Sequence, residues 1–326
     1  MIISKTPFRI SFFGGGSDLP SFYNQSPGYV VSATINKYLY ISLNKKFDDS
    51  IRVSYSVTEN VDNIEHLNHD IVKNILKFYN IYSGIEIASI SDLPSNGTGM
   101  GASSAFAVGL IAAIQDYKFP NSPMSKNLMA KLACQIEIEH CKKPIGKQDQ
   151  YACAFGGFNA HSFDFYTVQS KKLNLDQDVI EFLENNLILL YTSKGRSADD
   201  ILDKQNKNIL SQTKSFENLQ KMVDLAKQFE IDLNKKDLSN FADMLDYSWH
   251  LKKEISENIS NPDIDNMYQE AKNCGALGGK ILGAGGGGFM LLFADQNAQT
   301  KIKEKFKNNR PFNFKFDFDG PQTFKV

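Results

Sequence analysis

Two carboxylates on either side of a glycine turn have the types and spacing that a phosphoryl transfer could use. In EIEHCKKPIGKQDQ (137–150), Glu137 belongs to an expected helix and Asp149 follows the turn. Such a transfer needs a group that orients or deprotonates the attacking hydroxyl and a carboxylate that holds the metal ion. Glu137 and Asp149 could supply both, and Gln148 could hydrogen-bond a substrate. Because charges at a helix end are often simply solvated, this segment alone does not decide the chemistry.

A glycine-rich loop precedes a strongly apolar stretch in DLPSNGTGMGASSA (92–105). Its alternating glycines allow backbone N–H groups to approach an anion, and the N-terminus of the following helix adds partial positive charge. The loop lacks both the GxxxxGK[ST] pattern of a P-loop and the GxGxxG pattern of a dinucleotide site, and alone it would also fit a capped turn. The predicted phosphate-binding residues are Pro94, Gly97, Gly99, Met100, Gly101, Ala102, Ser103 and Ser104, of which the two serines could also reach a phosphate-bound Mg²⁺.

A third segment, KILGAGGGGF (280–289), contains four successive glycines. Ordering them would cost considerable backbone entropy, which suggests that something passes very close to this backbone. The apolar flanks favour a buried, ordered loop over a flexible one. We therefore expect Gly285, Gly286 and Gly287 to approach the phosphates or the acceptor.

The N-terminal segment TPFRISFFGGGSD (6–18) places an arginine on a strand and a carboxylate after three glycines. Asp18 could accept hydrogen bonds from a polyol, and Arg9 could stabilise an anionic base. Either residue could instead be an ordinary charge at a strand end. The substrate contacts expected here are Gly15, Gly16, Ser17 and Asp18.

Composition excludes several classes of protein. The 326 residues carry 36 Lys and Arg against 37 Asp and Glu, so no broad basic surface for nucleic acid is expected. The four cysteines show neither CxxC spacing nor nearby paired histidines, which argues against a zinc site or a disulfide framework and fits a reducing cytoplasm. The first residues include Lys5 and Arg9 within their apolar stretch, so neither a signal peptide nor a membrane span is expected.

The length of the chain favours two domains, with a boundary near residue 170, and helices framed by strands suggest that the second domain is α+β. The first third is mainly β, followed by a central apolar helix, and residues 198–253 form amphipathic helices. The expected strands are 2–13, 29–43 (one strand or two), 51–57, 85–90, 187–191 and 289–293, with aromatic alternation over 312–318; the expected helices are 70–79, 103–116 and 125–140.

Together, and in this order, the four segments resemble the motifs of the GHMP small-molecule kinase superfamily, which includes galactokinase, homoserine kinase and mevalonate kinase. The resemblance covers residues 6–288. It implies an N-terminal ATP-binding domain like ribosomal protein S5 domain 2 (1–170), a C-terminal ferredoxin-like domain (171–326), and an active site in the cleft. It also implies ATP as the phosphoryl donor and Mg²⁺ as the cofactor.

The resemblance also assigns roles to single residues. IGKQDQYACAFGGFN (145–159) is similar to the superfamily's Gly-x-x-Asp-Gln stretch, so Asp149 falls on the catalytic base and Arg9 on the cation that lowers its pKa. Glu137 and Ser104 fall on the metal-binding positions. Asp18 falls on the sugar-binding aspartate, although glycines replace the usual Glu-His pair before it.

Within the superfamily, GGGSDLPSFY, IGKQDQYACAFGGFN and TSKGRSADDIL together most resemble the bacterial D-glycero-D-manno-heptose 7-phosphate kinases. This implies phosphorylation of an anomeric hydroxyl to give heptose 1,7-bisphosphate for surface polysaccharide. Lys194 and Arg196 are the candidates for the 7-phosphate, because ammonium and guanidinium groups can contact a phosphate together. The alternatives are another acceptor, such as fucose, galactose or a phosphorylated isoprenoid precursor, and a non-catalytic sugar and ATP sensor. The oligomeric state is not predicted.

Overall fold

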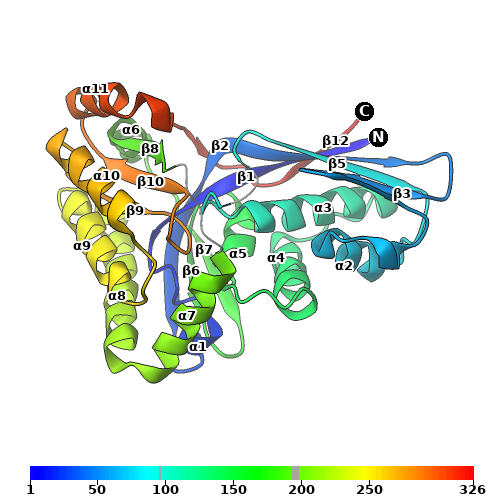
Figure 1. The fold of residues 1–326 in the computed structure, drawn as a ribbon, viewed down its shortest axis with the longest axis horizontal. Helices are drawn as coiled ribbons and strands as arrows, with labels where there is room; N and C mark the ends of the chain where they lie inside the picture. Colours follow the sequence, from blue (N-terminus) through cyan, green and yellow to red (C-terminus); the bar gives the residue numbers. More distant parts are fainter. Residues whose placement is uncertain (95–96, 193–197) are drawn as a thin grey trace.

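The computed structural model describes residues 1–94, 97–192 and 198–326. Two long antiparallel strands, β1 (Ile2–Phe13) and β2 (Gly28–Lys45), run through the middle of the molecule and connect its two parts (Figure 1). One end of β2 pairs with β5 (Ile85–Ser91) and the other with β6 (Phe158–Phe163). A single strand therefore supports two regions of the same sheet.

In the described residues this first sheet has nine strands, with the order β12-β1-β2-β5-β3-β4 along its main path. All its pairings are antiparallel except that of β3 with β5. The remaining members are β3 (Ile51–Ser54), β4 (Thr58–Val61), β7 (Val168–Lys172), β11 (Phe316–Asp317) and β12 (Gln322–Lys325). The last two bring the end of the chain back to the N-terminal strands.

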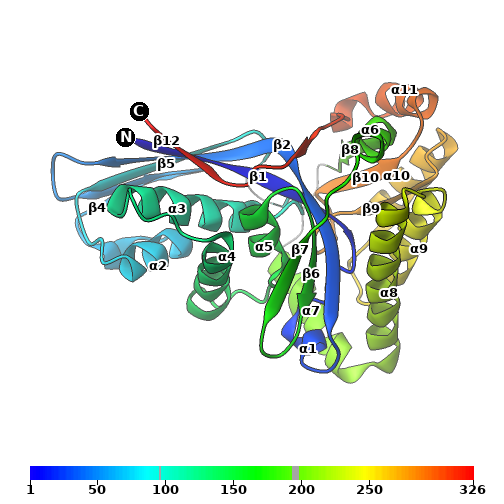
Figure 2. The same cartoon turned by 180° about the vertical axis from the view of Figure 1, so that it is seen from behind.

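Helix α3 (Ala102–Lys118) lies at the centre of the first part and is buried from Ser104 to Ile114. Its small residues let it approach the sheet closely: a Cβ on Gly109 would fall 2.7 Å from Thr6 Oγ1. The other helices on the same face of the sheet are α2 (Asp70–Phe78), α4 (Lys126–Cys134) and α5 (Gln148–Phe155) (Figure 2). A π-helical segment, Gln135–His140, continues α4 directly.

Over the residues that the structure describes, the second part contains a three-stranded antiparallel sheet in the order β8-β10-β9. Helices flank this sheet and extend along the N-terminal strands (Figure 1). Its elements are β8 (Leu187–Tyr191), β9 (Gly278–Ile281), β10 (Phe289–Phe293), α6 (Gln177–Asn186), α7 (Ala198–Ser211), α8 (Thr213–Lys235), α9 (Phe241–Lys253), α10 (Pro262–Asn273) and α11 (Gln296–Lys305).

Aromatic side chains join the two parts in one core. Phe13 of β1 lies 4.9 Å from Phe229 of α8 and 5.9 Å from Phe241 of α9, measured between ring centroids. All three rings are fully buried. Large aromatic rings in tilted and edge-to-face contact contribute both buried area and orientation, so they fix α8 and α9 against β1.

Most expected elements are confirmed, and the differences concern their extent and geometry. The stretch 29–43 is one continuous strand, and the helix expected over 125–140 changes from α to π geometry at Gln135. Residues 148–155 form helix α5 where a turn was expected, and only 316–317 of the stretch 312–318 form a strand. The boundary near residue 170 stays a prediction. None of the described helices combines the length and the apolar character needed to cross a membrane.

Candidate active site

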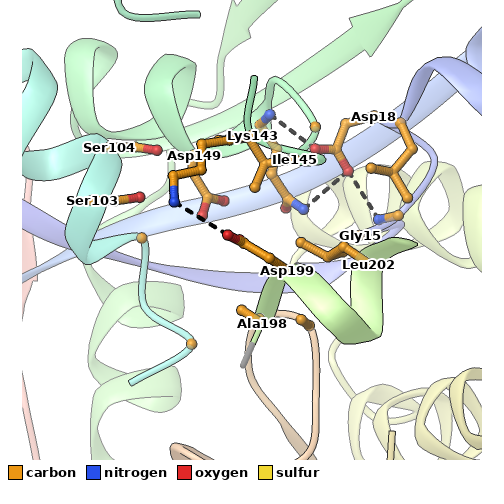
Figure 3. Close-up of a pocket in the computed structure, with 18 of the residues that line it drawn as sticks. Gly15, Asp18, Ser103, Ser104, Lys143, Ile145, Asp149, Ala198, Asp199 and Leu202 are labelled. Carbon is orange, nitrogen blue, oxygen red and sulfur yellow. Dashed lines mark hydrogen bonds and ion pairs between the residues drawn. The ribbon is translucent and has the colours of Figure 1, made fainter. Parts of the chain in front are cut away.

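A cavity of about 290 Å³ lies where the glycine loops of both parts meet (Figure 3). Ser103 and Ser104 lie on one side of it, Asp18 on the other and Asp149 between them. The first part contributes its glycine loops and the N-terminal ends of α3 and α5, and the second contributes residues of α7, α9 and the loop after β9. These latter residues are Ala198, Asp199, Leu202, Gln205, Lys252, Gly283 and Ala284.

The loop before α3 has the backbone that an anion site needs. Gly97, Gly99 and Gly101 all have positive φ, between 66° and 73°, and no side chain caps the helix. The first N–H groups of α3 therefore lack partners within the helix and lie at its positive end, where phosphate is favoured. Glycine is required at position 99 for a second reason: a Cβ there would fall 2.2 Å from the carbonyl oxygen of Leu282.

Arg9 holds Asp149 in a two-point ion pair. Its Nε and Nη2 donate to Oδ1 and Oδ2 of Asp149 at 2.8 and 2.7 Å, and Nη1 donates to the carbonyl of Gly99 at 2.6 Å. The Arg9 side chain is 2% exposed and that of Asp149 is 25% exposed. The buried guanidinium therefore fixes a carboxylate that still reaches the cavity, as expected for a group that must orient an attacking hydroxyl.

Glu137 is a fully buried carboxylate on the π-helical segment. Its Oε2 accepts hydrogen bonds from Ser104 Oγ and Gln150 Nε2, both at 2.7 Å, whereas its Oε1 is buried and has no partner in the part of the chain that the structure describes. Burial raises the pKa of this carboxyl group. An orphaned carboxylate oxygen beside a serine hydroxyl, at the positive end of α3, fits a hard cation shared with phosphate.

The described residues contain no group of three or more His, Cys, Asp or Glu that could hold a metal alone. Mg²⁺ usually binds to one or two carboxylates and completes its coordination with water and substrate phosphates. Ser104 and Glu137 therefore suit Mg²⁺ that arrives with a nucleotide better than a permanently bound metal.

Asp18 is buried at the opposite end of the cavity and is held by protein donors. Its Oδ1 accepts from the Gly16 backbone and from Gln148 Nε2, at 2.9 and 3.0 Å, and its Oδ2 accepts from the Gln148 backbone at 3.0 Å. Burial raises its pKa, which these bonds oppose. Gly146 is required beside it, since a Cβ there would fall 1.9 Å from Oδ2. Asp18 thus positions Gln148 as well as lining the cavity.

Several residues predicted for this site lie elsewhere. Ser17 is buried, and its hydroxyl bonds to the backbone of Gly14 and Tyr29. Met100 is buried, and its carbonyl accepts from the Arg9 backbone. Pro94, Gly285, Gly286 and Gly287 are also outside the cavity lining, and Gly286 instead donates to the carbonyl of Ile259. Lys194 and Arg196 lie outside the described residues.

The loop after β9 reaches the cavity slightly earlier in the chain than the sequence predicted, before Gly285 rather than at it. Gly283 and Ala284 line the cavity, and a Cβ on Gly283 would fall 2.5 Å from the Cα of Gly99. Gly288 also approaches the glycine loop before α3 (97–101, the phosphate loop). A Cβ on Gly288 would fall 2.6 Å from the carbonyl oxygen of Gly97. The glycines therefore allow two loops to touch each other, which their number alone could not distinguish from ligand contact.

Two lysines on the cavity wall were missed by sequence reasoning. Lys143 pairs with Asp199 at 3.2 Å, and this bond closes one side of the cavity (Figure 3). Lys252 comes from α9, is 5% exposed, and donates to the carbonyl of Gly283. Burial, with Arg9 as the next cause, lowers its pKa to about 8. The sequence has no signal for it beyond its position three residues after Trp249 on the same helix.

Comparisons with known proteins agree with this geometry. The models for the GHMP kinases N terminal domain and GHMP kinases C terminal match residues 66–157 and 225–311. A D-glycero-alpha-D-manno-heptose 7-phosphate kinase from Campylobacter jejuni is 32% identical, with 100% of this chain and 99% of that protein covered.

Solved structures show the same fold. A Campylobacter jejuni protein is 30% identical with a TM-score of 0.79, over 100% of this chain and 98% of that one. A D-glycero-D-manno-heptose 1-phosphate kinase from Bacteroides thetaiotaomicron is 24% identical with a TM-score of 0.81, over 100% and 99% of the two chains. The family models, the full-length relative and the phosphate loop beside a carboxylate pair all lead to one conclusion: this chain belongs to the GHMP kinase family and is an ATP-dependent kinase.

Proposed function

We propose that this kinase phosphorylates the anomeric hydroxyl of D-glycero-D-manno-heptose 7-phosphate. The product would be heptose 1,7-bisphosphate, for the heptose of a surface polysaccharide. The observation that carries the proposal is the 32% identity, over essentially the full length of both proteins, to a heptose 7-phosphate kinase. Motif residues identify the donor chemistry better than the acceptor, so the acceptor is the part that most needs a test.

The donor phosphates would lie on the free N–H groups at the start of α3, between Gly97 and Ser104. Ser104 and Glu137 would hold Mg²⁺, which neutralises developing charge on the phosphate oxygens. The closely packed loops around Gly99 and Gly283 would keep water away from this position.

Asp149 would orient the acceptor hydroxyl and take its proton on the carboxylate. Arg9 fixes that carboxylate through both oxygens, so the base cannot rotate away from the acceptor. On the acceptor side, Gln148 lines the cavity and is held in place by Asp18. Correct placement of the hydroxyl matters because an ångström of misplacement can reduce a rate by about a hundredfold.

Lys194 and Arg196 stay our candidates for the 7-phosphate. Among the described cavity residues, Lys143 also lies on the wall that faces α7, where it pairs with Asp199 and would have to exchange that carboxylate for a phosphate. A sugar phosphate needs such cationic groups, whereas an unphosphorylated sugar does not.

The test is an ADP-release assay over a panel of sugars and sugar phosphates, followed by ³¹P NMR of the product. Heptose 7-phosphate should give the fastest turnover and a new anomeric phosphate signal beside the retained 7-phosphate. Activity confined to unphosphorylated sugars such as fucose or galactose would contradict the proposal.

A matched pair of variants tests the base. Asp149→Asn should remove most turnover, roughly a thousandfold, while nucleotide affinity stays near that of the wild type. Asp116→Asn is the control, because Asp116 is also a partly buried carboxylate, 3.5 Å from Lys325, and lies at the far end of α3. Near-normal turnover by Asp149→Asn would show that another group is the base.

A further inference from the structure

Lys252 is a buried ammonium group that is only partly satisfied by the protein. It lies in the last turn of α9, lines the cavity, and donates to the carbonyl of Gly283. An ammonium has three N–H donors, so a single backbone acceptor leaves two of them without a hydrogen-bond partner among the described residues. Among the described residues no carboxylate pairs with it within 4.0 Å.

The surrounding carboxylates compensate the charge of this lysine only in part. Asp149 is held through both oxygens by Arg9, and Asp18 is held by Gly16 and Gln148. Arg9 itself repels Lys252. A buried cation without a paired carboxylate is unfavourable in the free protein, and it becomes favourable when an anion enters the cavity.

Lys280 makes an informative contrast. It is also a buried lysine in the same neighbourhood, and its Nζ donates to the Phe12 carbonyl at 2.8 Å. It does not line the cavity. Lys280 therefore serves the junction between β9 and β1, whereas Lys252 faces the place where substrate must bind.

The position of Lys252 relative to the base indicates which anion it meets. Gly283, its backbone partner, touches Gly99, and Gly99 accepts from Arg9, which holds Asp149. Gly99 and Gly283 touch each other, and their carbonyl groups accept from Arg9 of the first part and Lys252 of the second part respectively. The phosphoryl group in transfer has to pass between the phosphate loop and Asp149, beside this contact.

We propose that Lys252 is a catalytic residue that binds the phosphoryl group during its transfer from ATP to the acceptor. The bond between the γ-phosphorus and the bridging oxygen breaks, and its electron pair leaves with ADP. A new bond forms between that phosphorus and the acceptor oxygen, whose proton goes to the carboxylate of Asp149. Lys252 stays protonated and stabilises the charge on the transferred oxygens, as other preorganised donors do.

The proposal rests on the kinase activity and on Asp149 as base, and it is independent of which sugar is the acceptor. The variants are Lys252→Met, which keeps the length of the side chain without its charge, and Lys252→Arg. The matched control is Lys253→Met, since Lys253 is the next residue on α9 and pairs with Asp265 at 3.3 Å outside the cavity.

Lys252→Met should lower kcat by about 100- to 1,000-fold, the effect of removing one transition-state donor, with KM for ATP changed by less than threefold. Its melting temperature should equal or exceed that of the wild type, because an unpaired buried charge is removed. A lowered melting temperature together with a raised KM and an unchanged kcat would mean that Lys252 only holds the Gly283 loop, which would overturn the proposal.

A binding measurement decides the matter even if no tested sugar is a substrate. ADP with Mg²⁺ and fluoroaluminate mimics the transferred phosphoryl group, and calorimetry compares its affinity with that of ADP alone. The wild type and Lys253→Met should bind the analogue more tightly than ADP, whereas Lys252→Met should lose that difference at unchanged ADP affinity. An undiminished difference in Lys252→Met would refute the role of Lys252 without bearing on the heptose acceptor.

The pH profile supplies a third signature. Burial lowers the pKa of Lys252 to about 8, Arg9 acts in the same direction, and Asp18 and Asp149 oppose them. Lys280 lies on the neighbouring β9 and also interacts with it electrostatically. If the protonated lysine is needed, kcat/KM of the wild type falls as the pH rises through about 8. Lys252→Arg keeps its charge and should lack this fall; a fall that persists would assign it to another group.

Discussion

Replacing Arg9 by methionine tests how strongly the site depends on a single buried cation. Arg9 makes three side-chain hydrogen bonds, two to Asp149 and one to the Gly99 carbonyl, and is 2% exposed. Methionine fills much of the same volume but leaves both partners without their donor. The loss should therefore reflect the ion pair more than a cavity.

The magnitude follows from the burial of the two partners. Removing one member of a buried ion pair costs about 3–5 kcal/mol, because the other charge is left uncompensated. Asp149 is 25% exposed, so water can solvate it in part, and the lower end of that range applies. We expect Arg9→Met to lower the free energy of unfolding by about 3 kcal/mol and the turnover by about a hundredfold through misplacement of Asp149.

Urea denaturation, monitored by fluorescence, measures the free energy of unfolding. The control variant is Arg52→Met. Arg52 pairs with Glu86 at 3.2 Å on the sheet surface, where the two side chains are 49% and 39% exposed. Such an exposed pair contributes less than about 1 kcal/mol. If the two variants lost the same stability, the buried ion pair would not have the role assigned to it. The double variant Arg9→Met with Asp149→Asn should recover part of the loss, since it removes the uncompensated charge.

Three further predictions follow from single contacts. Gly99→Ala should destabilise the protein by at least about 2 kcal/mol more than Gly84→Ala. Both glycines have positive φ, but only a Cβ at position 99 would clash, with the Leu282 carbonyl. Urea titration of the two variants measures the difference, and equal losses of stability would contradict the packing argument. Glu137→Gln should raise the Mg²⁺ concentration at which ADP gives half of its maximal thermal stabilisation by about tenfold or more. Thermal melts at increasing Mg²⁺ concentration measure this value. An unchanged Mg²⁺ concentration would show that Glu137 is not a metal ligand. Burial lowers the pKa of His161 to about 3 from 6.5, so the folded state binds its proton less readily than the unfolded state. Stability is then complete above pH 6.5 and falls by roughly 1.4 kcal/mol per unit as the pH drops towards 3, a slope that His161→Gln should reduce.

Local pattern was sufficient to predict the strands and helices with strong periodicity. The small, apolar composition around Ala105 indicated a buried central helix, and α3 confirms it. Helix α5 was missed because its residues 148–155 follow a proline and a glycine turn and mix polar with small side chains, which gives no clear helical periodicity. Packing against α3 and α4 stabilises this helix. The π-helical segment at Gln135 has no signal in the sequence, since none of its residue types specifies the wider i→i+5 hydrogen-bond spacing.

For the site, residue type and order were enough to assemble the parts of a kinase. The glycines before α3, Asp149 and Arg9 line one cavity, and Glu137 is buried next to it, where it accepts a hydrogen bond from the cavity residue Ser104. Gly285 to Gly287 could not be placed in the same way. A glycine run indicates only that the backbone comes close to something, and here the neighbour is the phosphate loop itself.

Lys252 shows what only the tertiary structure decided. In the sequence it is one lysine among many at a helix end, where such residues are normally solvated. Its backbone partner, Gly283, lies 31 residues further along the chain, and its burial arises from the packing of α9 against α8, β9 and the N-terminal strand β1. Sequence determines chemical capacity through residue type and local backbone preference, whereas the environment that makes a charge functional, its burial and its neighbours, exists only once distant segments have packed together.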